Sequence, residues 1–232
     1  MAADSRITLV DRETGAIQGM IDDIRKIYRV KKNNIGISYW GLATIEGKSM
    51  LEFLEELENE RIGDEDNVDS IARKLVDCLQ KIKPPIDTKM GLHIAGYLQE
   101  KENYYPKLRH VFHENWHSAG KFTNEDCHIE FHQKGKKIRF PSYNSYPVLF
   151  NGDNNIANCL FNYIPIISNQ RIRSDLITLD ESLDLAEIIL SLAIQRLNYY
   201  FNPEGNKIYK SVGGKIYIAR IRPKIGFDWY KE

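Results

Sequence analysis

Apolar and polar positions alternate through the first part of the chain in a way that favours strands over helices. The segment 1–43 makes a polar excursion through Asp11–Gly15 and returns through Arg25–Val30. It then turns at Asn33-Asn34 and continues as the apolar run Ile35–Gly41. We therefore expect paired strands at the start of the protein, ending at a glycine just before a region of helical spacing.

Three later segments carry apolar residues at the spacing of an amphipathic helix. Asn67 or Asp69 can cap the second of these helices, and Asp180 can cap the third. The predicted helices are Thr44–Glu60, a segment from Val68 that ends before Pro84-Pro85, and Leu179–Leu197. In the first helix, Leu51, Leu54 and Leu57 form the apolar face, and Glu52, Glu55, Glu56 and Glu58 lie mostly on the opposite face.

A second set of strands follows the first two helices. Gly91–Tyr97 and Lys107–Phe112 predict a hairpin, and basic residues around Gly135 predict the tip of another. Val148–Ala157 has the pattern of a strand, a polar turn and a helix start. This order of elements suits two sheets flanked by helices, because each sheet and each helix must bury one face.

Composition fits one domain over 1–232. The chain has 232 residues, 42% of them hydrophobic, and 32 basic residues balance 32 acidic ones. We therefore expect no nucleic-acid partner and, without an apolar run near 18 residues, no membrane partner. Three cysteines without metal-type spacing suit a reducing compartment, so a cytoplasmic location is expected. The first residues also lack the pattern of a signal peptide.

Histidines are dense in the middle of the chain and raise the question of a metal. Their spacings match no metal motif, so hydrogen-bonded or exposed histidines are the simpler interpretation, and we expect no metal and no cofactor. The basic residues near Gly135 could contact nucleic acid, but a hairpin tip is the better explanation because the net charge of the chain is zero. The histidine group is His110, His113, His117, His128 and His132, with Cys127 nearby.

Lys26 is the charged residue most in need of an explanation. It interrupts a run that favours a strand, next to Ile27, Tyr28 and Val30. One interpretation is that Lys26 is buried and that its ammonium group faces an aspartate. A plain hairpin with solvated charges is the alternative, because buried charge is rare without a reason.

The residues around Lys26 and Asp4 resemble the opening of proteasome β-type subunits and their bacterial relatives. These proteins belong to the N-terminal-nucleophile (Ntn) hydrolase superfamily. The resemblance lies in Ala2–Thr8, in Lys26–Tyr28 and in the strand that ends at Gly41, and it recurs in Ala95–Tyr97 after two helices. It implies an α+β fold, a four-layer αββα sandwich of two antiparallel sheets flanked by helices.

The resemblance also implies roles for individual residues. Asp4 and Lys26 match the aspartate and lysine that support the terminal amine of the nucleophile, and the backbone N–H groups of Trp40 and Gly41 match the oxyanion donors. Trp40 stands where relatives usually have glycine. Three supporting positions depart from the family pattern. They are Gly152 or Asp153 at the first serine, Val212 at the second serine, and Tyr209 or Ile208 at the second aspartate, which leaves Asp184 or another carboxylate open.

The matching nucleophile is a threonine on a strand ahead of Ala2, and the printed sequence begins at Met1. One hypothesis is that Met1 is an internal methionine and that the protein is a threonine-type peptidase or amidase acting on a peptide or amide substrate. Another is a non-catalytic, proteasome-like scaffold that assembles with copies of itself or with related subunits. A third possibility is an unrelated sandwich protein that binds small molecules.

Overall fold

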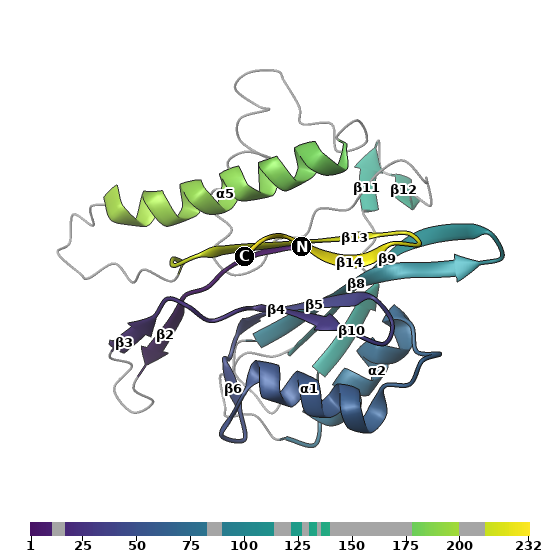
Figure 1. Cartoon of the computed structure of the whole chain (residues 1–232), viewed down its shortest axis with the longest axis horizontal. Coiled ribbons are helices and arrows are strands. Elements are labelled where there is room, and N and C mark those ends of the chain that lie inside the picture. The colour runs from purple at the N-terminus through teal and green to yellow at the C-terminus, as the bar shows by residue number, and fades with distance from the viewer. Residues whose placement is uncertain are drawn as a thin grey trace. The chain divides into compact units, whose positions relative to one another are not determined.

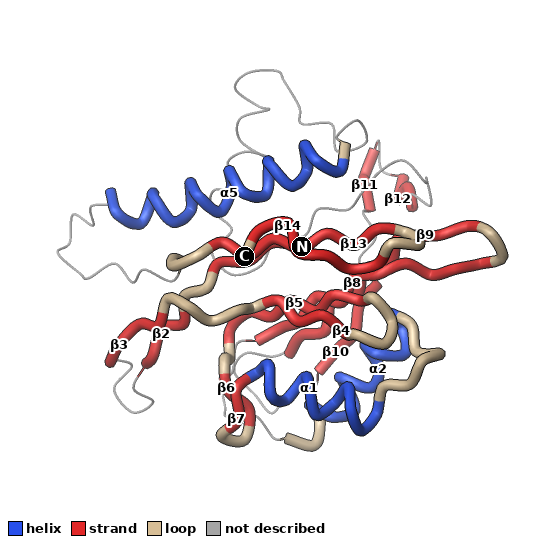
Figure 2. The backbone as a smooth tube through the Cα atoms, viewed as in Figure 1, coloured by secondary structure: helices blue, strands red, loops and turns tan. Residues whose placement is uncertain are grey.

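The computed structural model describes residues 1–10, 17–82, 90–113, 122–126, 130–133, 136–139, 178–199 and 212–232. These residues form a mixed α+β fold (Figures 1 and 2). They divide into two compact units that interleave along the chain. The first unit comprises Met1, 27–149 and 219–228, and the second comprises 2–26, 150–218 and 229–232. A single domain over the whole chain stays a prediction.

The elements carry the labels of Figure 1. The helices are α1 (Met50–Arg61), α2 (Val68–Leu79) and α5 (Leu179–Tyr199). The strands are β1 (Ala2–Asp4), β2 (Ile7–Val10), β3 (Ile17–Ile21), β4 (Ile27–Val30), β5 (Ile35–Gly41), β6 (Thr44–Ile45), β7 (Lys48–Ser49), β8 (Met90–Glu100), β9 (Asn103–His113), β10 (Phe122–Asp126), β11 (Glu130–Gln133), β12 (Lys136–Arg139), β13 (Ile216–Arg222) and β14 (Gly226–Lys231).

The first unit is built on an antiparallel sheet in the order β10-β9-β8-β5-β4. Helices α1 and α2 pack on one face of this sheet (Figure 1). Because successive strand residues point to opposite faces, only alternate positions of β5 enter the core beneath the helices. Ile35, Ile37 and Tyr39 do so and are almost fully buried with Leu54 of α1 and Leu75 of α2. This core contributes the hydrophobic stabilisation of the unit.

The opposite face of β5 accepts a second layer at Gly36. A Cβ atom there would lie 3.0 Å from Ile221 Cδ1, 3.2 Å from Phe227 Cε2 and 2.5 Å from Met1 Sδ. A glycine is therefore required for the end of the β13–β14 hairpin to come this close to β5. The first unit thus has packed layers on both faces of its sheet.

The start of α1 differs from the sequence prediction. A short β6–β7 hairpin occupies the residues from Thr44, and both residues of its turn, Glu46 and Gly47, have positive φ. Ser49 then caps the helix by accepting from the Glu52 N–H at 3.2 Å, and the Glu52 carboxylate accepts from the Ser49 N–H at 2.7 Å. The prediction of a helix from Thr44 was wrong because a turn and a capping box override helical spacing here.

Glu58 was predicted to lie on the polar face of α1, but it is buried. Its side chain is 4% exposed and accepts from Tyr28 Oη at 2.5 Å and from the Lys31 N–H at 2.8 Å. A buried carboxylate is stable only when such donors surround it. Glu58 therefore anchors α1 to β4 and its following turn, whereas Glu55 and Glu56 are exposed as expected.

Other sequence predictions for the first unit are confirmed. Asn67 caps α2 by accepting from the N–H groups of Asp69 and Ser70 at 3.0 and 3.1 Å. Strands β8 and β9 form one long hairpin whose last pair is Glu100 with Asn103. Strands β11 and β12 pair on either side of Gly135. The predicted strand and helix start at Val148–Ala157 lies outside the described residues.

In the second unit, β1 pairs antiparallel with β13, which also lies next to β14. Helix α5 packs against β1. The cap of α5 is Thr178 and not Asp180, because Thr178 Oγ1 accepts from the Glu181 N–H at 3.2 Å and the Glu181 carboxylate accepts from the Thr178 N–H at 2.7 Å. Strands β2 and β3 form a separate two-stranded ribbon. Within the described residues, no helix has both the length and the apolar character needed to cross a membrane.

Candidate active site

Asp4 and Lys26 form an ion pair in the second unit. Lys26 Nζ lies 2.9 Å from Asp4 Oδ1, and the two side chains are only 15% and 13% exposed. Asp4 is the last residue of β1, and Lys26 is the residue before β4. The predicted pairing of the two residues is confirmed, and the alternative of a hairpin with solvated charges is wrong.

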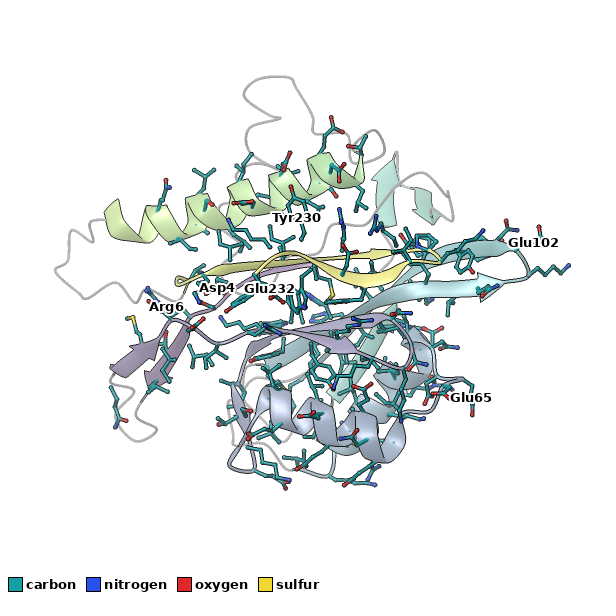
Figure 3. The ribbon with its side chains drawn as sticks, in the orientation of Figure 1. Asp4, Arg6, Glu65, Glu102, Tyr230 and Glu232 are labelled. Atoms are coloured by element: carbon teal, nitrogen blue, oxygen red, sulfur yellow. The ribbon has the colours of Figure 1, made fainter. Side chains whose placement is uncertain are left out.

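Backbone amides hold the second oxygen of the Asp4 carboxylate. Asp4 Oδ2 accepts from the Arg6 N–H at 3.1 Å and from the Gly213 N–H at 3.0 Å. Figure 3 shows Asp4 and Arg6 close together where the chain leaves β1. An ammonium group has three N–H donors. Among the described residues Asp4 is the acceptor for Lys26, so two donors of the ammonium remain for a further group.

Hydrogen bonds of Ser5 connect the segments next to Asp4 and Lys26. Its side chain is 0% exposed, its Oγ donates to the Asp22 carbonyl, and the same Oγ accepts from the Lys215 N–H at 2.8 Å. Its backbone N–H donates to the Gly213 carbonyl at 3.2 Å, and its carbonyl accepts from the Ile24 N–H at 3.1 Å. All of these bonds lie within the second unit. The hydroxyl of Ser5 is thus committed to holding the loop and is not arranged as a nucleophile.

Gly213 and Gly214 let the loop before β13 approach this point. A Cβ on Gly213 would lie 2.3 Å from Arg6 Cζ. Gly214 has φ +74°, and a Cβ there would lie 2.3 Å from Ser5 Oγ and 2.4 Å from the Asp22 carbonyl oxygen. Only glycine combines this backbone conformation with so close a contact. The amide that holds Asp4 therefore depends on the glycine pair.

Arg6 and Asp22 form the rim of the site. Arg6 Nε lies 2.5 Å from Asp22 Oδ1, and Arg6 Nη2 lies 2.6 Å from Asp22 Oδ2. The two side chains thus form a bidentate ion pair, whose geometry is more specific than that of a single hydrogen bond. Hydrogen bonding to Arg6 lowers the pKa of Asp22. Arg6 Nη1 also donates to the Val212 carbonyl at 3.5 Å. Arg6 therefore joins the β1–β2 connection to the loop before β13.

Trp40 and Gly41 lie in the first unit, at the end of β5. Trp40 pairs with Gly91 of β8, where a Cβ would lie 2.6 Å from the indole nitrogen, so the indole covers Gly91. Gly41 has φ +82° and is exposed. Strand β4 pairs with β5 only as far as Ser38, so both residues extend beyond that pairing. Because Asp4 and Lys26 belong to the second unit, a common site of all four residues stays a prediction.

The other predicted positions fall into two groups. Val212 is buried, and its carbonyl is the acceptor for Arg6. Asp184 is exposed on α5 and accepts from Tyr230 Oη at 3.4 Å, so its described partner is not Lys26. Four positions lie outside the described residues. They are Gly152, Asp153, Ile208 and Tyr209.

Sequence reasoning missed two parts of this cluster. It did not join Arg6 to Asp22, and it did not assign the Gly213 N–H to Asp4. The available signal was the glycine pair itself, because two successive glycines before a strand often mark a close approach of backbone to another group. Partners that are 209 residues apart, as Asp4 and Gly213 are, leave no local pattern in the sequence.

The cluster has a defined chemical capacity. A fixed ammonium disfavours the protonated form of a neighbouring amine and favours a developing negative charge on a neighbouring oxygen. Among the described residues no three His, Cys, Asp or Glu side chains are grouped in a way that could hold a metal ion. No protein-family model matches this chain, and no curated protein matches it. The interpretation of the site therefore rests on its own geometry and on the resemblance in its motifs.

Proposed function

We propose that this protein is a proteasome-like Ntn hydrolase that cleaves peptide or amide bonds by acyl transfer. The Asp4–Lys26 ion pair is the observation that carries the proposal. The pair is 2.9 Å apart, mostly shielded from water, and fixed by the amides of Arg6 and Gly213. Removing two charges from water has a large desolvation cost, so a pair held in this way supports a chemical role.

In the proposed reaction, the hydroxyl oxygen of an N-terminal threonine attacks the substrate carbonyl carbon, and the α-amine of that threonine takes the hydroxyl proton. The C–N bond then breaks, the leaving amine takes the proton, and water hydrolyses the ester that remains. Lys26 lowers the pKa of the α-amine through its charge, and Asp4 holds Lys26 in place. The backbone N–H groups of Trp40 and Gly41 are the proposed donors to the oxyanion.

The proposal includes the four-layer αββα arrangement. In the first unit, α1 and α2 cover one face of the five-stranded sheet, and residues 219–228 lie against the other face at Gly36. In the second unit, α5 packs against β1, which shares a sheet with β13. These separate contacts support two sheets between helical layers, which is the architecture that the resemblance implies.

A second candidate function is a non-catalytic, proteasome-like subunit that assembles with copies of itself or with related subunits. Exposed apolar side chains support this candidate, because surfaces of this kind mark contacts between proteins when they gather. Leu9, Met20 and Ile21 on the β2–β3 ribbon are 43%, 41% and 43% exposed. Ile188 and Leu192 on α5 are 52% and 40% exposed.

The N-terminus of the protein purified from its native source separates the two candidates. Intact-mass measurement and N-terminal sequencing are expected to give a chain that begins with threonine ahead of Ala2. Such a protein is expected to hydrolyse fluorogenic peptide amides. A terminus at Met1 or Ala2 overturns the hydrolase. Light scattering then tests the scaffold, for which a protein that stays monomeric at high concentration is the contrary result.

Substitution of Lys26 tests the role of the ion pair in the same native-length protein. Lys26→Met is expected to lower kcat/KM by about 10²–10⁴, the usual contribution of a proton-transfer arrangement. Lys48→Met is the matched control, because Lys48 is an exposed lysine whose described partner is the exposed Glu56. Equal activities of the two folded variants would remove Lys26 from the mechanism.

A further inference from the structure

Two histidines face each other across strands β8 and β9 of the first unit. His93 pairs directly with His110 in the register, and their ring centroids are 4.8 Å apart. Their strand neighbours Leu92 and Val111 belong to the core beneath α1 and α2. Because side chains alternate between faces, His93 and His110 lie together on the face of the sheet away from those helices.

Aromatic rings surround the histidine pair. The Phe112 ring stacks on His110 with centroids 4.5 Å apart, and the Trp40 ring lies 6.2 Å from His110. Burial lowers the pKa of His93 to about 3, with the nearby His110 adding to the effect, and burial lowers the pKa of His110 to about 4.

The row that contains the pair continues across the sheet. Ser38 of β5 is the register partner of His93. Residues directly opposite each other in antiparallel strands belong to one face. A serine and two histidines thus occupy three successive strands, β5, β8 and β9, in a single row.

We propose that His93 and His110 bind one divalent transition-metal ion, such as Zn²⁺, between β8 and β9. Zinc binds imidazole nitrogen at about 2.0–2.1 Å, so a tetrahedral ion needs two nitrogens about 3.3 Å apart. Rings with centroids 4.8 Å apart can meet this requirement. Water completes the coordination, which makes this a two-histidine site of moderate affinity. The site is independent of the proposed hydrolase and joins two strands that are already paired.

The ligand type determines which metals bind. Imidazole suits zinc, copper and nickel, whereas Mg²⁺ and Ca²⁺ require oxygen ligands. Affinity is expected to be highest for Cu²⁺, in keeping with the general order for divalent metals. An ion that binds only the folded protein raises the free energy of unfolding by RT ln(1 + [L]/Kd), which increases with the logarithm of the ion concentration above Kd. Zn²⁺ is therefore expected to raise the thermal midpoint of the full chain, and Mg²⁺ is expected to leave it unchanged.

The test is titration of the full chain with Zn²⁺ in competition with a chromogenic chelator. His93→Gln and His110→Gln are each expected to weaken binding about tenfold or more, since even residues that only support a ligand cost about 10–100-fold. His113→Gln is the matched control, because His113 lies on the same strand as His110 but on the opposite face, and it should bind as the parent does. Circular dichroism verifies that each variant is folded.

A measurement on the unaltered protein avoids any effect of substitution on folding. In ¹H–¹⁵N spectra of the imidazole groups, Zn²⁺ is expected to shift the nitrogen signals of His93 and His110 first. The proposal is overturned by absence of zinc uptake, by shifts confined to other histidines, or by unchanged binding in both folded variants. Equal weakening by His113→Gln also overturns it.

Discussion

The Asp4–Lys26 pair permits a sharp test by double-mutant cycle. The changes are Lys26→Met, Asp4→Asn and the two together. Methionine keeps much of the length of the lysine side chain without its charge. Asparagine keeps an oxygen that can accept from the Gly213 and Arg6 N–H groups, which now bond to the Asp4 carboxylate. Each single change therefore removes the ion pair with little change of shape.

The expected magnitude follows from burial. Exposed ion pairs contribute about 0–1 kcal/mol, whereas breaking a buried pair costs about 3–5 kcal/mol. With side chains 15% and 13% exposed, Lys26 and Asp4 lie closer to the buried limit. The Asp4 carboxylate keeps two backbone donors when Lys26 is replaced, which moderates the loss. We expect Lys26→Met to lower the free energy of unfolding by about 2–4 kcal/mol, with a coupling energy of about 1.5–3 kcal/mol.

The assay is urea unfolding at pH 7 followed by circular dichroism, with all four proteins measured side by side. The same cycle on Lys48 and Glu56 is the control, because these residues are 2.6 Å apart but about half exposed, and we expect a coupling near zero. A coupling below about 0.5 kcal/mol for Asp4 and Lys26 would mean that their charges are solvated. The physical basis of the proposed active site would then be lost.

Two further predictions concern stability. Gly214 has φ +74°, and the Gly214→Ala change places a Cβ 2.3 Å from a serine hydroxyl oxygen. Gly47 has a similar φ of +80° but open space around it, so Gly47→Ala is the control. In denaturant titrations, Gly214→Ala should lower the free energy of unfolding by about 1–3 kcal/mol more than Gly47→Ala does. Equal losses would contradict the close approach. Burial alone would raise the pKa of Asp66, but hydrogen bonds, chiefly from Lys74, lower it overall. The stability lost in Asp66→Asn should therefore be fully expressed above about pH 4 and should vanish as the pH falls through the native pKa of Asp66. The exposed Asp64→Asn variant is the matched control.

Strand positions near the start of the chain were predictable because two local signals agreed there. Alternation marked the strands, and a lysine inside a strand-favouring run required a partner. The pattern left a hairpin with solvated charges open, and the resemblance in the motifs named Asp4 as the partner of Lys26. The sequence could not predict the Gly213 N–H on Asp4, because that bond joins residues 209 positions apart. It also gave no motif for the Arg6–Asp22 contact, although only 16 positions separate those two residues.

Errors at the helix starts have a different origin. Helical spacing was correct for α1 and α5, but the first residue of α1 and the capping residue of α5 were misplaced. At α1 a turn of two positive-φ residues and the Ser49–Glu52 capping box decide where the helix begins. At α5 the Thr178–Glu181 box does so. A serine or threonine that is followed three residues later by glutamate indicates a capping box. This pattern would have identified Ser49 and Thr178 as the two caps.

The pairing of β1 with β13 has a consequence for biosynthesis. Met1 and Ala219 exchange backbone hydrogen bonds of 2.7 and 2.8 Å although 218 positions separate them. At about 5–20 residues per second, a ribosome needs roughly 10–40 seconds to deliver the second of these strands after the first has emerged. During that interval the nascent chain has an unmatched edge that invites aggregation. The pairing of β1 must therefore wait until β13 has been synthesised, and a chaperone that covers β1 during this interval is expected to protect the nascent chain.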